Sequence, residues 1–184
     1  MLDRLLALLM LIGLSPVFLI VSLLILIDDG FPVFFTQKRV GKDYSFFELY
    51  KFRTMKKNTP NVATHLLENP EKYVLKVGKI LRKLSLDEVP NLLNILKGEM
   101  VFVGPRPALY NQDDLMQLRV DAGVAHLMPG LTGWAQINGR DEISIEAKVA
   151  LEKEYLEKKS FLFDVKIFFL TFASAFLKKE GVSH

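Results

Sequence analysis

The sequence contains no cysteine among its 184 residues. This absence excludes a disulfide framework, a zinc site with thiolate ligands and a cysteine nucleophile. Histidine is nearly as scarce, and no metal-ligand spacing connects His65, His126 and His184. The sequence also lacks a Walker loop, a dinucleotide-binding fingerprint and a serine–histidine–acid arrangement. Any chemistry must therefore come from other residue types.

No charge of one sign dominates the chain either. It carries 24 Lys and Arg against 21 Asp and Glu, which gives a formal net charge of +3 at pH 7. A mildly basic balance favours anionic partners without choosing among phosphorylated metabolites, anionic lipid and nucleic acid. We expect no nucleic-acid partner, because the basic residues are scattered and no recognised binding motif occurs.

One long hydrophobic run stands near the start of the sequence. Residues 5–27 carry no charge, and this run exceeds the ~20 residues needed to span a bilayer core. Ser15-Pro16 interrupts the run near its middle, and proline removes a backbone donor and kinks a helix. A kinked segment can cross the bilayer or turn back to the side it entered, and hydropathy does not separate these two topologies.

After this segment, the pattern predicts a short β-hairpin. Two strand-like stretches within residues 31–54 flank a turn at Gly41-Lys42-Asp43. Residues 56–70 are polar and contain two prolines, which favours a loop with a short helix near 62–68.

Helices account for most of the remaining sequence, so the expected fold class is α+β and mostly helical. They are predicted over residues 71–84, 86–96, 112–126, 143–159 and about 161–179. Ser85 with Glu88 three residues later is typical of a capping box, and Gly98 is expected to end that helix. A glycine-rich loop is predicted over 128–141, with a short extended piece at 134–137.

The last predicted helix is rich in phenylalanine. Its only charges are at Asp164, Lys166 and the terminal Lys178-Lys179. This pattern fits a core helix, and it also fits a helix that lies in the membrane interface with its lysines near lipid phosphates.

The densest pattern lies in residues 79–107, where two adjacent acids, Asp87 and Glu88, stand between basic residues. These bases are Lys79, Arg82, Lys83 and Arg106. A carboxylate and a phosphate repel by about 4 kcal/mol at ~4 Å and an effective dielectric near ~20. Arginine side chains and a divalent cation remove that barrier. Acids at a helix start also oppose the helix dipole, so the pair alone leaves a structural role open.

Three further motifs contain cations. They are Lys51-Phe-Arg-Thr-Met55, Gly104-Pro-Arg-Pro107 and Asn138-Gly-Arg140. Each alone fits an ordinary turn or an exposed strand with solvated cations. Together they put several cations around one acidic pair, which favours a shared site over a chance arrangement.

These motifs, in this order, resemble the bacterial sugar transferase family, the monotopic polyprenyl-phosphate phosphoglycosyl transferases. The resemblance covers almost the whole chain, and such a set is far more specific than any single piece. The matching stretches are Leu14-Ser-Pro16, Pro32-Val-Phe-Phe-Thr-Gln-Lys-Arg-Val-Gly41, Tyr50-Lys-Phe-Arg-Thr-Met55, Leu84-Ser-Leu-Asp-Glu-Val-Pro-Asn-Leu-Leu93, Gly104-Pro-Arg-Pro107, Pro129-Gly-Leu-Thr-Gly-Trp-Ala-Gln-Ile-Asn-Gly-Arg140 and Phe163-Asp-Val-Lys166.

The resemblance implies a reaction and its residues. Such enzymes move a sugar 1-phosphate from a UDP-sugar to a polyprenyl phosphate, such as undecaprenyl phosphate, and release UMP. Asp87 would be the nucleophile that carries a covalent phosphosugar, and Glu88 its partner as magnesium ligand or base. The implied cofactor is Mg²⁺, with Asp87 and Glu88 as its ligands. The matches to phosphate-binding positions are Arg82, Arg106, Arg140 and, more weakly, Lys51.

The resemblance also implies an architecture. Residues 1–29 would form a re-entrant membrane helix, broken at Ser15-Pro16, that enters and leaves on the cytoplasmic side. Residues 30–184 would form a cytosol-facing catalytic domain that includes the interfacial helix at about 161–179. The protein would then be monotopic in the bacterial inner membrane, with the phospholipid bilayer as a partner. Only Asp3-Arg4 precede the apolar run, where family members usually carry basic residues.

Two other functions stay open at this point. A direct glycosyltransferase would break the sugar–phosphate bond and release UDP instead of UMP. A membrane-anchored basic module that binds anionic lipid or holds an assembly complex would need no acidic pair. The sequence identifies neither the sugar, the polyprenol length, the glycan pathway nor the oligomeric state, for which a homodimer is one option.

Overall fold

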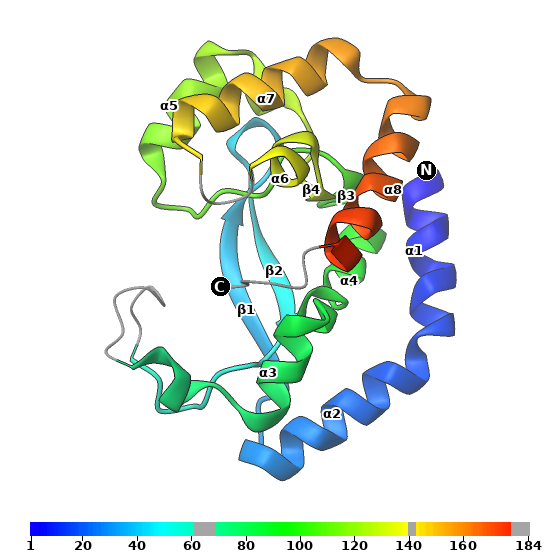
Figure 1. The fold of residues 1–184 in the computed structure, drawn as a ribbon, viewed down its shortest axis with the longest axis vertical. Coiled ribbons are helices and arrows are strands. Elements are labelled where there is room, and N and C mark those ends of the chain that lie inside the picture. Colours follow the sequence, from blue (N-terminus) through cyan, green and yellow to red (C-terminus); the bar gives the residue numbers. More distant parts are fainter. Residues whose placement is uncertain (61–68, 140–142, 178–184) are drawn as a thin grey trace.

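The computed structural model describes residues 1–60, 69–139 and 143–177. Its helices and strands are α1 (Leu2–Gly13), α2 (Ser15–Asp29), β1 (Phe34–Val40), β2 (Phe46–Phe52), α3 (Lys76–Lys83), α4 (Asn91–Lys97), β3 (Val101–Val103), α5 (Asp113–Asp121), β4 (Gly130–Thr132), α6 (Trp134–Asn138), α7 (Ile145–Lys158) and α8 (Phe161–Leu177). Figure 1 shows α1 and α2 as a bent arm along one side of the molecule, with the β1–β2 hairpin running lengthwise through its middle. The predicted α+β, mostly helical class is confirmed.

The β1–β2 hairpin matches the predicted pair of strands. The strands pair antiparallel along their whole length and are joined by a 3₁₀ turn at Lys42–Tyr44. Side chains alternate across a strand, so Phe47, Leu49 and Lys51 project from the same face of β2. Phe47 and Leu49 are buried in the main core. The same face therefore carries Lys51 inward, toward the elements that pack on the hairpin.

The N-terminal apolar run is broken near its middle. The axes of α1 and α2 differ by 61°, and the Ser15 hydroxyl donates to the Ile12 carbonyl at 2.7 Å. Pro16 lies in the first turn of α2, where its missing N–H costs no helical hydrogen bond. Among the described helices, no single one is long and apolar enough to cross a bilayer. The bent pair of α1 and α2 together has the necessary length and apolar composition. The membrane placement of residues 1–29 stays a prediction.

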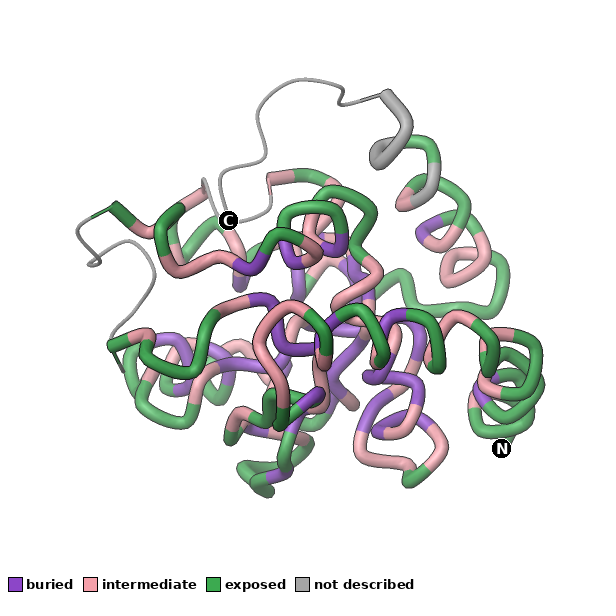
Figure 2. The backbone as a smooth tube through the Cα atoms, turned by 90° about the horizontal axis from the view of Figure 1, so that it is seen from below, coloured by how far each residue is buried: buried purple, intermediate pink, exposed green. Residues whose placement is uncertain are grey.

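Both N-terminal helices contribute to the cores. Ala7 of α1 is buried with Leu92 and Ile95 of α4, and Val21 and Ile25 of α2 lie in a second cluster under the hairpin and α3. The opposite faces carry exposed apolar side chains, and the tube beside the N-terminus in Figure 2 is mostly green, the colour of exposed residues. These exposed residues include Leu5, Leu9, Ile12, Leu19, Ile20, Leu23 and Leu24.

The chain before α4 departs from the single helix predicted over 86–96. Ser85 has a left-handed backbone with a φ of 54°, and its side chain makes no capping hydrogen bond, so the predicted capping box is wrong. A 3₁₀ turn covers Leu86–Glu88, and α4 begins after Pro90. Proline has no N–H to donate and therefore fits a helix start. Gly98 ends α4 as predicted, with a φ of 84°.

The other predicted helices are present with shorter bounds. The one over 71–84 is α3, preceded by a 3₁₀ turn at Pro70–Tyr73, and the one over 112–126 is α5, followed by a 3₁₀ turn at Val124–His126. The helices expected over 143–159 and 161–179 are α7 and α8.

The extended piece predicted at 134–137 is wrong. That stretch is helix α6, and the extended segment, β4, lies just before it. A five-residue helix is too short to display a 3.6-residue period, so the sequence pattern did not reveal it. The helix predicted near 62–68 lies outside the described residues, as do Lys178 and Lys179.

A second sheet, of two short parallel strands, carries the loop that contains Arg106. β3 pairs with β4, and Gly104 follows β3 directly. A Cβ atom on Gly104 would lie 2.3 Å from the carbonyl oxygen of Met128, and one on Gly133 would lie 2.1 Å from that of Gly104. Only glycine allows the two backbones to approach so closely, and this approach fixes the loop against β4.

Candidate active site

Glu88 lies at the centre of a cluster of charged side chains. Its Oε1 accepts a hydrogen bond from Lys51 Nζ at 2.6 Å and another from Arg106 Nη2 at 3.3 Å. Burial opposes ionisation of this carboxyl group, but Arg106 and Lys51 outweigh burial and lower the pKa of Glu88 to about 2. Glu88 is therefore ionised at neutral pH and held by two cations.

Asp87 stands beside Glu88 in a different electrostatic setting. Within the described residues, its half-buried carboxylate forms no ion pair. Burial raises the pKa of Asp87, and the Glu88 carboxylate raises it further, against the opposing effects of Lys51 and Arg82. A carboxylate without an ion pair to Lys or Arg is more basic than one that has such a pair, which suits a nucleophile.

Arg82 extends the positive field toward Asp87 from α3. Its Nε donates to the Thr54 hydroxyl at 2.9 Å. α3 packs directly on this part of the chain, since a Cβ atom on Gly78 would lie 2.4 Å from the Thr54 carbonyl oxygen. Burial lowers the pKa of Arg82 while the charge of Asp87 raises it, so the two side chains act on each other without an ion pair. An arginine stays charged in such a place.

The loop of residues 104–107 presents Arg106 to the cluster. Two backbone hydrogen bonds join this loop to β4. Gly104 N donates to the Thr132 carbonyl at 2.9 Å, and Gly130 N donates to the Pro105 carbonyl at 2.8 Å. From β1, Arg39 Nη1 donates to the Pro107 carbonyl at 3.0 Å. These bonds hold the loop between the two sheets.

Sequence reasoning missed a buried ion pair behind this loop. Arg119 of α5 and Glu152 of α7 are 5% and 2% exposed. Arg119 Nε donates to Glu152 Oε2 at 2.7 Å, and Arg119 Nη2 contacts Glu152 Oε1 and donates to the Arg106 carbonyl at 2.9 Å. The partners are separated by 33 positions in helices that also carry many solvated charges, so no local pattern marks them.

A second missed residue joins the strand that carries Lys51 to the helix that follows the acidic pair. Asn94 of α4 is fully buried. Its Oδ1 accepts from Tyr50 N at 3.1 Å, and its Nδ2 donates to the Glu48 carbonyl and to Glu99 Oε2, both at 2.7 Å. These bonds fix β2 against α4 and so set the distance from Lys51 to Glu88.

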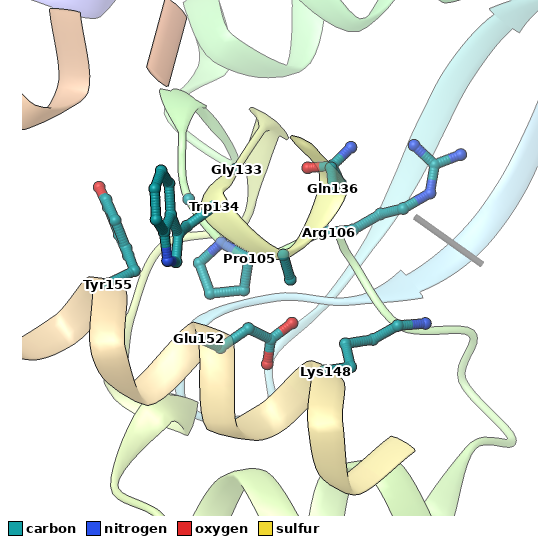
Figure 3. A pocket seen from close by; sticks show the side chains of 10 residues that line it. Pro105, Arg106, Gly133, Trp134, Gln136, Lys148, Glu152 and Tyr155 are labelled. Carbon is teal, nitrogen blue, oxygen red and sulfur yellow. The ribbon is translucent and has the colours of Figure 1, made fainter. Parts of the chain in front are cut away.

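Two pockets lie at Arg106. The smaller one is lined by Glu88 and Asn91 among others. The larger one lies between the 104–107 loop, α6 and α7 (Figure 3). Figure 3 shows Arg106 and Lys148 extending toward one end of the larger pocket, with the Trp134 ring at the other. The larger pocket is thus cationic at the end that lies toward the acidic pair.

The donor set fits a magnesium ion only if the substrate completes it. In the described part of the chain, no three acidic or histidine side chains gather into a metal-binding group. Mg²⁺ is commonly bound by one or two carboxylates together with substrate phosphates and water. Asp87 can supply one such carboxylate. Glu88 can supply a second ligand atom, Oε2, because its contacts with Lys51 and Arg106 both use Oε1.

The structure therefore gathers most of the predicted site residues. Lys51, Arg82 and Arg106 come from three separate elements and surround the Asp87-Glu88 pair. Arg140 lies outside the described residues. Ser15 and Pro16 lie at the bend between α1 and α2, apart from this cluster. The roles assigned to all of these residues stay predictions.

Comparison with known proteins identifies the family. The exopolysaccharide production protein ExoY of Sinorhizobium fredii is 40% identical over 96% of this chain and 84% of its own length. The uncharacterized sugar transferase EpsL of Bacillus subtilis is 42% identical over 91% of this chain and 81% of its own. The UDP-glucose:undecaprenyl-phosphate glucose-1-phosphate transferase of Escherichia coli is 40% identical over 97% of this chain, but the match spans 40% of that protein.

The sequence profile described as bacterial sugar transferase matches residues 1–178, and the relatives agree with it over nearly the whole chain. The resemblance that the ordered motifs indicated is thereby confirmed, and this chain belongs to the bacterial sugar transferase family.

Proposed function

We propose that this protein transfers a sugar 1-phosphate from a UDP-sugar to a polyprenyl phosphate, such as undecaprenyl phosphate, and releases UMP. The unequal state of the acidic pair carries the proposal. Glu88 is bound by Lys51 and Arg106, whereas Asp87 has no ion pair within the described residues, and burial raises its pKa. One carboxylate is fixed, and its neighbour is left to attack. Relatives named as undecaprenyl-phosphate sugar phosphotransferases support the same reaction class.

The proposed reaction has two displacement steps at one phosphorus atom. In the first, an Asp87 carboxylate oxygen bonds to the β-phosphorus of the UDP-sugar, and the bond from that phosphorus to the bridging oxygen breaks. UMP leaves with the bridging oxygen. In the second, an oxygen of the polyprenyl phosphate bonds to the same phosphorus, and the Asp87 carboxylate leaves. Covalent catalysis thereby divides one difficult displacement between two dianionic partners into two easier ones.

The surrounding cations would lower the charge barrier in both steps. Lys51, Arg82 and Arg106 together face an acidic pair and an incoming diphosphate, so the site holds positive charge where negative charge gathers. The family resemblance adds Arg140 to this set. Glu88 would act as the partner of Asp87, as magnesium ligand or as base toward the lipid phosphate.

We propose Mg²⁺ as the cofactor, held by Asp87 and Glu88 and by the donor diphosphate. When bound, such an ion supplies further positive charge to the transferring phosphoryl group. The chain's own cations would bind and orient the diphosphate whether or not Glu88 Oε2 contacts the metal.

We propose that the protein is monotopic in the bacterial inner membrane, with the site facing the cytoplasm. The exposed apolar faces of α1 and α2 support this placement, and α8 exposes Phe161, Leu162 and Phe169. A helix with such a face and nearby lysines suits the membrane interface. The lipid phosphate of the acceptor would lie at the same depth as the acidic pair.

Product analysis tests the reaction directly. The chain of residues 1–184 in lipid nanodiscs is incubated with undecaprenyl phosphate, Mg²⁺ and a panel of UDP-sugars, and UMP and UDP are quantified. UMP with a lipid-linked diphosphate sugar is the expected result. UDP as the product would instead indicate a direct glycosyltransferase. Neither nucleotide from any donor would favour the non-enzymatic lipid-binding module.

Intermediate trapping tests the covalent step. A donor labelled in the sugar is added without acceptor, and the protein is denatured at once and examined by mass spectrometry. The expected adduct is a sugar phosphate on Asp87, and it should disappear when undecaprenyl phosphate is added. An active enzyme that never carries label on this residue would contradict the two-step route.

A further inference from the structure

The Arg119–Glu152 pair lies in the contact between α5 and α7, beside buried apolar side chains. Its neighbours on these helices, Leu115, Met116 and Val149, are buried in one hydrophobic cluster. A buried ion pair is a weak source of stability, because apolar residues of similar size often serve such a contact as well or better. The pair is therefore better explained by something that it holds than by packing alone.

The group that Arg119 holds is the backbone of Arg106. While Arg119 Nε and Nη2 bind the Glu152 carboxylate, Nη2 also donates to the Arg106 carbonyl at 2.9 Å. Prolines on both sides of Arg106 restrict the backbone of the loop. Fixing its carbonyl therefore also limits the direction of its side chain, whose Nη2 reaches Glu88 Oε1 at 3.3 Å.

We propose that the buried Arg119–Glu152 pair is a positioning device that sets Arg106 for phosphoryl transfer. The inference rests on the proposed function. Glu152 orients the guanidinium of Arg119, Arg119 holds the Arg106 carbonyl, and the Arg106 side chain faces Glu88 and the donor diphosphate. Arg119 and Glu152 act through Arg106 and take no part in bond making or breaking.

The first test replaces the pair by apolar side chains. The double variant Arg119→Met/Glu152→Leu leaves no unpaired buried charge, so it should fold with a thermal midpoint near that of the wild type. It should nevertheless lose kcat for UMP release by about tenfold or more, with a smaller change in KM for the donor. A double variant that melts normally and turns over at the wild-type rate would overturn the proposal.

A matched control separates positioning from loss of packing. Val149→Ala loosens the same α5–α7 contact without touching the ion pair. It should lower the thermal midpoint and leave kcat within about twofold of the wild type. A fall in kcat equal to that of the double variant would mean that the contact, and not the pair, controls the rate.

A double-mutant cycle with Arg106 shows through which residue the pair acts. In an Arg106→Ala background, the same double replacement should change the remaining kcat by less than about twofold. Equal losses in both backgrounds would reject an action through Arg106. If Arg119→Met/Glu152→Leu fails to fold, Arg119→Lys is used in the cycle, since lysine keeps the charge but cannot bind both partners with one planar group.

The wild-type assay keeps the two failures apart. Absence of UMP from the wild type would reject the proposed function whatever the variants do. Release of UMP by the wild type, together with full activity of the folded double variant, would reject only the positioning role.

Discussion

Asp87 and Glu88 are chain neighbours, yet their surroundings move their pKa values in opposite directions. For Asp87, burial and the charge of Glu88 outweigh the attraction of Lys51. For Glu88, direct contact with Arg106 and Lys51 outweighs burial. Carboxyl groups whose pKa values are separated in this way commonly divide the work of a site between them. The geometry anchors Glu88 between Lys51 and Arg106, and we propose Asp87 as the reactive carboxylate.

Asp87→Asn is the substitution that isolates this division. We expect it to lower UMP release by about 10³-fold or more, because the amide is not a nucleophile. Folding should be unchanged or improved. The raised pKa of Asp87 means that its ionised form costs stability above the ordinary carboxyl pKa, and asparagine removes that cost. Turnover and thermal melts are measured together, and near-normal turnover would remove Asp87 from the nucleophile role.

Glu88→Gln tests the opposite case, a carboxyl group whose pKa is lowered in the folded protein and whose charge therefore stabilises it. The pKa of Glu88 falls from the ordinary 4.5 to about 2. The ionised carboxylate therefore contributes about 3 kcal/mol to the unfolding free energy, and this contribution is fully present at pH values above the ordinary pKa. This contribution is lost as pH falls from about 4.5 toward about 2. Glutamine resembles the protonated acid, so the unfolding free energies of wild type and variant should differ most at neutral pH and converge in acid. A difference in unfolding free energy that does not change with pH would contradict the contacts of Glu88 with Lys51 and Arg106.

At the scale of elements, local chemistry predicted the hairpin and the end of α4. The turn at residues 41–43 and the left-handed Gly98 each have their own sequence signal. Ser85 carried an equally clear capping signal, but that prediction was wrong, because the backbone of Ser85 is left-handed and its side chain caps no helix. β3 and β4 are each three residues long, and their pairing depends on the close approach of Gly104 to residues 128–133. Such a contact is set by tertiary packing and leaves no periodic pattern.

The glycine contact makes a prediction at the same scale. Gly133→Ala keeps an allowed extended backbone, with a φ of −171°, but puts a methyl group 2.1 Å from the Gly104 carbonyl oxygen. The loop must move, so we expect a loss of about 2 kcal/mol in unfolding free energy and a clear fall in kcat as Arg106 shifts.

Gly13→Ala at the end of α1 is the matched control for Gly133→Ala. An added Cβ there meets no heavy atom within 4 Å. Stability should stay within about 1 kcal/mol of the wild type, and turnover should be unchanged. Denaturant unfolding and UMP release are compared for both variants. Equal effects of the two substitutions would show that the close approach of the backbones does not position the loop.

For the whole molecule, the site combines elements that lie far apart in the sequence, from β2 at Phe46–Phe52 to α7 at Ile145–Lys158. Motif order predicted that Lys51 and Arg106 would meet the acidic pair, because their spacing matches a family pattern. It predicted neither Asn94 nor the Arg119–Glu152 pair, whose partners are brought together only by the packing of β2 on α4 and of α5 on α7. The residues that gather at the acidic pair were readable from the sequence, and the residues that hold them in place were not.

The N-terminal helices also belong to this packing, and the division into a membrane helix at 1–29 and a catalytic domain at 30–184 stays a prediction. Arg53, which is 6% exposed, pairs with Asp29 and donates to the Gly30 carbonyl at 2.6 Å. At the other end of the arm, Asp3 Oδ1 accepts from Phe102 N of β3 at 3.1 Å. The arm is thus bonded to the catalytic elements at both ends as well as through its buried side chains.

Deletion of residues 1–29 should therefore unfold the remainder as well as detach it from lipid. Burial of each large apolar side chain contributes about 1.5–3 kcal/mol, and a domain of this size is stable by only about 5–15 kcal/mol. Loss of Val21 and Ile25 exposes Phe52 in their cluster, and loss of Ala7 exposes Ile95, which together removes a large share of that margin. We expect the 30–184 fragment to give no cooperative melt by circular dichroism and to be digested rapidly by protease.

A variant of residues 1–184 with polar residues on the outer face of the arm separates anchoring from folding. Leu9→Gln, Leu19→Gln and Leu23→Gln change exposed positions only, so the combined variant should melt cooperatively and keep its protease resistance. Its binding to vesicles should fall, because each substitution removes apolar surface that would enter the bilayer. A 30–184 fragment that melts cooperatively would instead identify the arm as a separable anchor. Unchanged vesicle binding of the polar variant would place the membrane contact elsewhere on the molecule, where the exposed face of α8 is the next surface to alter.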